Sequence, residues 1–262
     1  MKDLIMVHGM KRTANHAVID WILAQDQFIF SNNIIPVAPI LRGEATLPEP
    51  VDFTLWLKRE HSPQKRFLRT LADPFLNRNR RIMVSLEDLE LGIQPFQNIP
   101  CPVTHVLILR NPQNLFASRI RKASRIDHPS YPRQTGEALD GYIRLWKSQA
   151  REFLGETSQL PDRVGVYFDR WFVDEEYRKA ISRRLDVEFT DAGFSGVSQV
   201  GGGSSFDGTR FDGQSGAMDV LNRRDQLDPD EQRLLETVLA DDELMELEAR
   251  IEAYLDESPD RT

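Results

Sequence analysis

The stretch LIMVHGMKRTANHAVIDWI, residues 4–22, decides the fold of this chain. It opens with four apolar residues, reaches Gly9, continues with the basic pair Lys11 and Arg12, and then takes the three- and four-residue spacing of an amphipathic helix. This order predicts a strand, a tight loop and a helix that begins near Asn15. We expect Gly9 to let the backbone turn at the end of the strand.

The loop that follows the first strand has the chemistry of an anion site. The first N–H groups of a helix lack intrahelical partners and carry partial positive charge, and here two cations lie beside them. Such a loop suits a phosphate or another multivalent oxyanion. An ordinary turn with Lys11 and Arg12 in solvent explains this stretch equally well, because the Gly-Lys-Ser/Thr of nucleotide-triphosphate loops is absent from it.

The composition bounds the class of protein and its partners. With 262 residues, 40% of them hydrophobic and 28% charged, the chain is long enough for a full core, and we expect one domain over residues 1–262. The formal net charge of -8 argues against a nucleic-acid partner, although a local basic pocket is compatible with it. A small molecule or a carbohydrate is the expected partner.

Cysteine content and hydropathy indicate the compartment. The single cysteine, Cys101, excludes an internal disulfide and a cysteine-based zinc cluster. No apolar run approaches the roughly 20 residues that a membrane span needs, and the first residues lead into a strand instead of a signal segment. We expect a cytoplasmic protein without a membrane partner. The sequence leaves the oligomeric state open.

Strand and helix patterns alternate along the rest of the chain. Apolar runs predict strands at residues 53–57, 80–88, 103–109 and 164–168. Periodic apolar residues predict helices at residues 138–154, 175–185, 230–239 and 242–255. This alternation predicts an α/β fold with a mainly parallel central sheet flanked by helices on both faces.

The strand at residues 103–109 leads into a second candidate anion site. Arg110 follows the strand directly, and Pro112 begins the next helix, where a missing N–H costs nothing. Ser118 comes eight residues after Arg110. The forked donors of the arginine and the hydroxyl of the serine are suited to clamp a second phosphate.

Two other segments have functional potential. Glu87 and Asp88 end the strand at residues 80–88, at the sheet edge where open α/β folds bind ligands; an acid at a helix start is the competing interpretation. From residue 194 to residue 216 the chain is rich in glycine and serine and has almost no aliphatic residue. That segment is either a disordered linker or a loop that orders over a ligand.

The two candidate anion sites together resemble those of the sulfotransferases that use 3′-phosphoadenosine 5′-phosphosulfate. In that family a strand leads into the loop Pro-(Lys/Arg)-(Ser/Thr)-Gly-(Ser/Thr)-(Ser/Thr), which holds the 5′-phosphosulfate. Met-Lys-Arg-Thr-Ala-Asn-His, residues 10–16, occupies the matching place. The resemblance implies a single-domain sulfotransferase architecture that is similar to a P-loop fold.

The resemblance assigns roles in this loop residue by residue. Arg12 takes the place of the family's cation and Thr13 that of its hydroxyl residue. Ala14 stands where the family prefers glycine, and Asn15 and His16 replace its hydroxyl pair. Amide and imidazole N–H groups can donate to an anion in place of those hydroxyls.

Two later motifs continue the resemblance. The family follows a strand with Arg-(Asp/Asn)-Pro and, eight residues after the arginine, a serine that helps to clamp the 3′-phosphate; Arg110 and Ser118 match this pattern. The family's third motif is a late glycine-containing loop with basic residues that closes over the adenosine. Its loose counterpart is the segment at residues 201–216, followed by Arg223 and Arg224, and we assign Arg224 to the nucleotide.

The implied reaction transfers a sulfuryl group in line from this donor to an acceptor hydroxyl or amine, with no metal required. Lys11, Arg12 and the first N–H groups of the helix would stabilise the leaving phosphate. Members of the family use a histidine or a glutamate near the end of the middle strand as the base. Glu87 lies nearest to that place, and His61 and His16 are the other candidates.

The sequence leaves two other functions and the acceptor open. A P-loop kinase of small metabolites would need a magnesium-binding Lys-Ser/Thr pair that the loop lacks. A catalytically silent nucleotide-binding relative is compatible with the departures from the family loop at Ala14, Asn15 and His16. The expected walls of the acceptor pocket are residues 28–52, 60–79 and 126–135, and none of them names a substrate.

Overall fold

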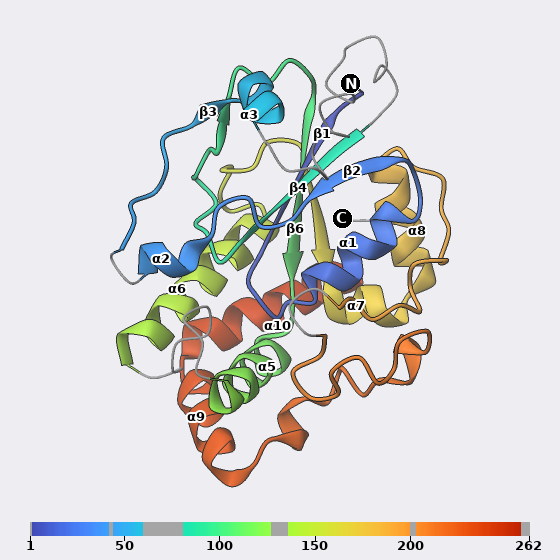
Figure 1. Ribbon diagram of the computed structural model, residues 1–262. Coiled ribbons are helices and arrows are strands. Elements are labelled where there is room, and N and C mark those ends of the chain that lie inside the picture. Colours follow the sequence, from blue (N-terminus) through green and yellow to red (C-terminus); the bar gives the residue numbers. More distant parts are fainter. Residues whose placement is uncertain (1, 42–43, 60–80, 127–135, 200–202, 258–262) are drawn as a thin grey trace.

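A five-stranded parallel sheet forms the centre of the computed structural model, which describes residues 2–41, 44–59, 81–126, 136–199 and 203–257 (Figure 1). Its strands are β1 (Leu4–Gly9), β2 (Phe28–Ser31), β4 (Arg81–Glu87), β6 (Val103–Leu109) and β7 (Arg163–Tyr167). They follow the order β2-β4-β1-β6-β7, with parallel pairing throughout. The predicted parallel sheet is therefore confirmed, with the opening strand at its middle.

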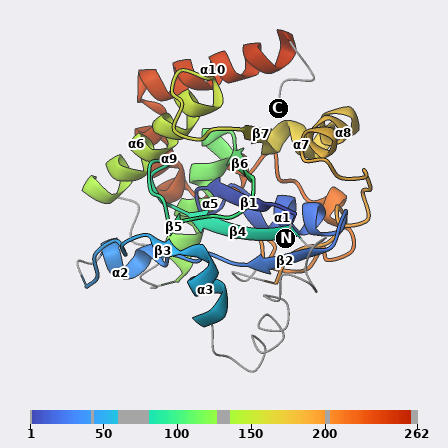
Figure 2. The same ribbon diagram turned by 90° about the horizontal axis from the view of Figure 1, so that it is seen from above.

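Helices cover both faces of this sheet. They are α1 (Asn15–Leu23), α5 (Pro112–Arg125), α6 (Gly136–Phe153), α7 (Phe168–Val173), α8 (Glu175–Arg184), α9 (Pro229–Leu239) and α10 (Asp242–Glu257). Figure 2 shows α1, α7 and α8 on one side of the sheet and α6, with α10 against it, on the other. The α/β class and the helical layers predicted from the sequence are confirmed.

The strand predicted at residues 53–57 is wrong. A short helix, α3 (Phe53–Arg59), occupies that place beside a two-stranded sheet of β3 (Val51–Asp52) and β5 (Phe96–Gln97). The carboxylate of Asp52 accepts from the backbone N–H of Leu55 at 2.9 Å, as a helix cap does. Phe53 and Trp56, three residues apart, both contact the ring of Phe96, with centroids at 5.0 and 4.9 Å. An apolar run of five residues fits a strand or a helix, and here the cap at Asp52 favours the helix.

Two further segments contain elements to which the sequence analysis assigned no secondary structure. Residues 28–52, expected as a wall of the acceptor pocket, contain β2 and the short helix α2 (Val37–Leu41). The helix α7, which the sequence analysis missed, begins directly after β7, so that no loop separates the two elements. Phe168 and Trp171 stack within α7, with ring centroids 5.7 Å apart.

The core lies on the two faces of the sheet. Its largest fully buried side chains include Trp21 of α1, Trp146 of α6 and Trp171 of α7. The apolar stripe predicted for the helix at residues 138–154 is buried as expected. Within the ranges that the structure describes, no helix combines the length and apolar character needed to cross a membrane.

A buried histidine pair joins β1 to β6. His8 Nε2 lies 2.9 Å from His105 Nδ1, and both side chains are almost fully buried. Burial lowers the pKa of His8 to about 3, and the charge of His105 adds to this effect. Burial also lowers the pKa of His105, against the attraction of Asp162 and Glu152. Both rings are therefore neutral at pH 7.

We expect this pair to make the stability depend on pH. The pKa of His8 is 6.5 in the unfolded chain and about 3 in the fold. Its contribution to the free energy of unfolding is therefore complete above pH 6.5. It is lost as the pH falls, because the unfolded chain then binds a proton that the folded protein does not. Below pH 6.5 the free energy of unfolding should decrease by about 1.4 kcal/mol per pH unit through His8. Urea unfolding between pH 8 and pH 5 measures this slope.

The control for this prediction is His8→Gln. The slope of its unfolding free energy against pH should be smaller than that of the wild type by about 1.4 kcal/mol per pH unit, because its unfolding takes up about one proton fewer. An equal slope in both proteins would contradict the assignment of the pH dependence to this pair.

Candidate active site

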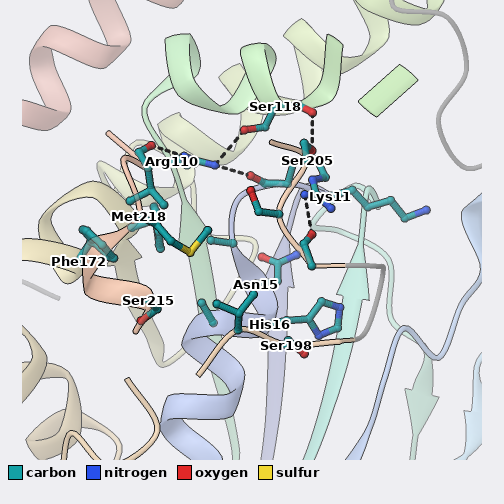
Figure 3. A pocket seen from close by; sticks show the side chains of 18 of the residues that line it. Lys11, Asn15, His16, Arg110, Ser118, Phe172, Ser198, Ser205, Ser215 and Met218 are labelled. Carbon is teal, nitrogen blue, oxygen red and sulfur yellow. Dashed lines mark hydrogen bonds between the residues drawn. The ribbon is translucent and has the colours of Figure 1, made fainter. Parts of the chain in front are cut away.

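A cavity of about 520 Å³ lies at the carboxyl ends of β1, β4 and β6, the edge where open parallel sheets bind ligands (Figure 3). Of the residues expected in the site, the cavity is lined by Lys11, Arg12, Ala14, Asn15, His16, Glu87, Arg110 and Ser118. Thr13 and Arg224 are not among the lining residues. Both candidate anion loops thus contribute to one cavity. His61 and the expected pocket walls at residues 60–79 and 127–135 lie outside the described residues.

Gly9 has a different role from the one expected. It is the last residue of β1, and its φ lies outside the left-handed region. A Cβ atom there would stand 2.4 Å from Asn15 Oδ1 and 3.1 Å from the Ile108 carbonyl oxygen. Glycine is therefore needed for close packing, and the left-handed residues of the loop are Arg12 (φ 76°) and Ala14 (φ 69°).

Ala14 has a backbone conformation that favours glycine, the residue that the resemblance places here. It precedes α1 as the N-cap residue in a left-handed conformation, with φ 69° and ψ 30°. This conformation is unfavourable for a residue with a Cβ atom by about 1–2 kcal/mol, whereas glycine adopts it freely. Alanine at this position therefore adds strain to the loop.

Thr13 and Asn15 brace the loop from inside. The fully buried hydroxyl of Thr13 donates to the Met10 carbonyl oxygen at 2.7 Å. Asn15 Nδ2 donates to the same oxygen at 3.1 Å and to Glu87 Oε1 at 3.0 Å. Since both amide hydrogens of Asn15 have acceptors within the protein, these two side chains fix the loop in place of the anion contacts expected of them.

A buried ion pair holds the backbone of Lys11. The carboxylate of Asp88, directly after β4, accepts from the Lys11 N–H at 2.9 Å. Arg119 of α5 donates through Nη1 to the Lys11 carbonyl oxygen and to Asp88 Oδ1, both at 2.9 Å. Both side chains are fully buried. Sequence reasoning missed this contact, because no spacing pattern relates Asp88 to Arg119.

Arg110 joins the two candidate anion loops. Its Nη1 donates to the Arg12 carbonyl oxygen at 3.1 Å and to Ser118 Oγ at 3.3 Å, and Nη2 donates to the Val220 carbonyl oxygen at 2.6 Å (Figure 3). The ring of Phe168 lies 5.0 Å from its Cζ atom. The arginine and serine that the sequence places eight residues apart are therefore in contact.

Unpaired donors remain in this charged site. Burial lowers the pKa of Arg110 to about 10, while the carboxylate of Asp169 opposes the shift, so Arg110 stays charged at pH 7. The buried Nε atoms of Arg12 and Arg110 have no hydrogen-bond partner among the described residues. Buried donors without acceptors are unfavourable, and an anion in the cavity would supply acceptors.

Residues 203–223, the covering segment, pack over both loops. Arg12 Nη2 donates to the Gly203 carbonyl oxygen at 2.9 Å, and Ser205 Oγ donates to the Ser118 carbonyl oxygen at 2.8 Å. Of the two interpretations of the glycine-rich stretch, the described part agrees with a loop ordered over the cavity. Residues 200–202 lie outside the described part.

Of two neighbouring arginines, Arg223 faces the cavity and Arg224, the one expected at the nucleotide, does not. Arg223 is buried, lines the cavity and forms an ion pair with Asp207 at 2.5 Å. Arg224 is exposed on the 3₁₀ helix η3 (Arg224–Gln226), where it donates to Gln113 Oε1 at 3.0 Å. Nothing in the sequence shows which of two adjacent arginines in an irregular segment points inward.

An aromatic wall, which the sequence analysis did not find, closes one side of the cavity. Its members are Phe168, Trp171, Phe172 and Phe194, and Met218 also lines the cavity. Phe194 contacts both Trp171 and Phe172, with centroids at 5.3 and 5.7 Å. The cavity is therefore lined both by cations, among them Lys11, Arg12 and Arg110, and by this apolar wall, which suits a planar ring.

Comparisons with known proteins identify the fold. Neither a protein-family model nor a curated protein matches the chain. The solved structure of mouse sulfotransferase SULT7A1 complexed with PAP matches with a TM-score of 0.52 and 11% identity, over 98% of this chain and 90% of that one. The chain has the sulfotransferase fold. A sulfotransferase domain from the curacin biosynthetic pathway matches with a TM-score of 0.46 and 12% identity, over 96% of this chain and 98% of that one.

The fold expected from the resemblance is thereby confirmed. In this sulfotransferase fold, the loop after β1 and the start of α5 lie at the carboxyl edge of the sheet, on neighbouring strands. The residues that carried the resemblance are close in space as well as matched in sequence order.

We expect Ala14→Gly to stabilise the protein. Relief of the left-handed strain, about 1–2 kcal/mol, exceeds the extra entropy of glycine in the unfolded chain, about 0.5–1 kcal/mol, so the unfolding free energy should rise by about 0.5–1 kcal/mol. Urea unfolding with an unchanged m-value measures the gain.

Ala17→Gly is the matched control, because Ala17 lies inside α1. The same substitution there should lower the unfolding free energy by about 1 kcal/mol. Equal effects of the two substitutions would show that strain at Ala14 is absent.

Proposed function

We propose that the protein is a sulfotransferase that moves a sulfuryl group from 3′-phosphoadenosine 5′-phosphosulfate to a hydroxyl or amine of a small-molecule or carbohydrate acceptor. One observation carries the proposal: two candidate anion sites meet in a single cavity, and Arg110 links them through the carbonyl of Arg12. A donor with phosphate groups at two positions of one ribose needs such a pair of sites.

The donor set fits this nucleotide. We assign the 5′-phosphosulfate to Lys11, Arg12 and the first turn of α1, and the 3′-phosphate to Arg110, Ser118 and Arg223. The unpartnered Nε atoms of Arg12 and Arg110 agree with anion binding at both places. The aromatic wall is suited to an adenine ring. That SULT7A1 was solved in complex with PAP supports the assignment.

The residues of the site contribute to the reaction by positioning the donor and by stabilising the negative charge on its leaving phosphate. The bound donor supplies the sulfuryl group. Lys11 and Arg12 neutralise negative charge on the phosphate side of the scissile bond. Arg110 and Ser118 orient the nucleotide. Glu87, buried at the end of β4 beside the same loop, assists removal of the acceptor's proton, and the arrangement requires no metal.

A catalytically silent nucleotide-binding relative is the second candidate. It is favoured by the side chains of Thr13 and Asn15, which serve the loop itself. Binding of the nucleotide without transfer to any acceptor in a broad screen would favour this candidate.

PAP, the nucleotide product, should stabilise the protein. A ligand that binds only the native state at about 100 times its Kd raises the unfolding free energy by about 2.7 kcal/mol. A thermal-shift titration with PAP and with adenosine 5′-phosphate measures this effect, and PAP should give the larger shift. No shift at millimolar PAP would overturn the proposed function.

Arg110→Gln should weaken PAP binding by about 10- to 100-fold, since hydrogen bonds to charged groups are worth about 1.5–3 kcal/mol. Ser118→Ala, which leaves the carbonyl contacts of Arg110 in place, is a milder second variant. Arg233→Ala, on the exposed face of α9, is the control. Calorimetric affinities for PAP test the assignment, and unchanged affinity in both site variants would contradict it.

Glu87→Gln should lower the turnover about 10²- to 10⁴-fold, the range of general acid–base catalysis, and leave PAP affinity unchanged. Release of PAP from the donor measures the rate. The control is Glu90→Gln, because Glu90 is exposed and lies outside the cavity lining. Wild-type turnover in Glu87→Gln would remove Glu87 from the reaction.

A further inference from the structure

We propose that the acceptor is a neutral polyhydroxylated molecule, a sugar or a polyol, and that Asn32 and Asn33 bind hydroxyl groups next to the one that reacts. The assignment of an acceptor class rests on the proposed function. Both asparagines line the same cavity, at the end that the assigned donor leaves open.

The order of the strands arranges the chemistry of the cavity in a row. Along the carboxyl edge of β2-β4-β1-β6-β7, the lining residues are in turn Asn32 and Asn33, Glu87, Lys11 and Arg12, Arg110, and Phe168. The donor is assigned to the groups that follow β1, β6 and β7, with its sulfuryl end beside the loop after β1. In-line transfer places the acceptor on the side of the sulfur opposite the leaving phosphate. The ends of β4 and β2 are therefore left for the acceptor.

Hydrogen bonds to β4 fix the orientation of both amides. The backbone N–H of Asn33 donates to Ser85 Oγ at 2.7 Å, so the one hydroxyl proton of Ser85 goes to Asn32 Oδ1, at 2.9 Å. Asn33 Oδ1 accepts from the backbone N–H of Glu87 at 3.4 Å. Because both amide oxygens face these donors, the Nδ2 group of each asparagine is left over. Neither Nδ2 group has a hydrogen-bond partner in the described part of the chain.

The backbone holds the two amides in place before a ligand binds. The N–H of Ile34 donates to the Ser85 carbonyl oxygen at 3.1 Å, so residues 33 and 34 are both bound to Ser85. Asn33 has a left-handed backbone with φ 42°, which asparagine adopts more readily than most residues. Binding groups that are already fixed lose little conformational entropy when they bind a ligand.

Glu87 supplies the matching hydrogen-bond acceptor. Its Oε1 accepts from Asn15 Nδ2 at 3.0 Å, whereas Oε2 has no hydrogen-bond partner among the described residues. Two donors and one acceptor therefore lie together, and neighbouring hydroxyl groups, which donate and accept, satisfy all three. The hydroxyl beside Glu87 gives its proton to Oε2 while its oxygen bonds to sulfur. The bond from sulfur to the bridging phosphate oxygen breaks, and its electron pair stays on that oxygen.

Other classes of acceptor fit this end of the cavity less well. A phenol or an apolar alcohol would leave the amide N–H groups without partners, which is unfavourable. The phenyl and indole rings of the described lining come from α7 and from Phe194, which packs against α7. An anionic acceptor would be repelled by Glu87, and a cationic one by Lys11 and Arg12. A neutral molecule with neighbouring hydroxyl groups meets none of these penalties.

The first test compares acceptors by the release of PAP from the donor. The polyhydroxylated probes are methyl glycosides and myo-inositol, and the probes with one hydroxyl group are cyclohexanol and phenol. The best polyhydroxylated probe should have a kcat/KM about tenfold or more above both, because each added hydrogen bond is worth about 2- to 10-fold. A preference for a methyl glycoside over myo-inositol, or the reverse, tells a sugar from a free polyol. An equal or higher kcat/KM for cyclohexanol or phenol would overturn the inference.

The second test removes the two amide donors. Asn33→Asp keeps an oxygen for the Glu87 N–H and loses the Nδ2 donor, and Asn32→Ala removes the other amide without adding charge. Each should raise KM for the best polyhydroxylated probe by about 5- to 20-fold and reduce its advantage over cyclohexanol, with PAP affinity unchanged. Gln94→Glu, an exposed amide outside the cavity lining, is the matched control. Wild-type selectivity in both site variants would overturn the inference.

The acceptor class and the proposed function fail in distinguishable ways. If the wild type does not bind PAP, or transfers the sulfuryl group to no acceptor, the proposed function falls and the acceptor class falls with it. If transfer occurs and cyclohexanol or phenol is the better acceptor, the sulfotransferase function stands and only the polyhydroxylated class falls.

Discussion

The buried ion pair between Asp88 and Arg119 is the constraint on which the site depends. Each charge is removed from water, which is unfavourable, and the pair is compensated by mutual attraction and by hydrogen bonds to both backbone groups of Lys11. Tyr142 of α6 adds its ring, 3.6 Å from the Arg119 Cζ atom. The end of β4, the loop after β1 and α5 are thereby fixed together. Because Ser118 directly precedes Arg119, the same contact sets the distance between the two candidate anion sites.

Around this constraint, polar groups divide into those that build the site and those left for a ligand. Thr13 and Asn15 have their partners inside the protein. Arg12 and Arg110 keep buried Nε donors without an acceptor in the described chain. If every donor of the loop formed a hydrogen bond within the protein, none would remain for an anion. If none did, the loop would have no defined conformation. Ala14, between them, holds the left-handed turn of the loop with φ 69°.

The sequence was most informative where a pattern depends on neighbouring residues. Apolar runs located four of the five strands of the main sheet, around residues 4–9, 81–87, 103–109 and 163–167, and periodic spacing located α6 within two residues. Five apolar residues at 53–57 were too few to separate helix from strand, and a cap at Asp52 decided the outcome. The same limit applies to Arg223 and Arg224. The sequence around them has no helical or strand periodicity, so it does not predict which of the two side chains points inward.

The sequence by itself determined the strand–loop–helix at residues 4–22, the spacing of Arg110 and Ser118, and through them the sulfotransferase fold. Only the tertiary structure decided which side chains face the cavity. The partners that settle this question are distant along the chain: Glu87 for Asn15, Asp88 for Lys11, and Gly203 for Arg12. The register of β1 against β4, which aligns Gly9 with Glu87, brings the first two together. Local composition cannot encode such contacts, because hydrogen bonds form between groups that the sheet places side by side, whatever their separation in sequence.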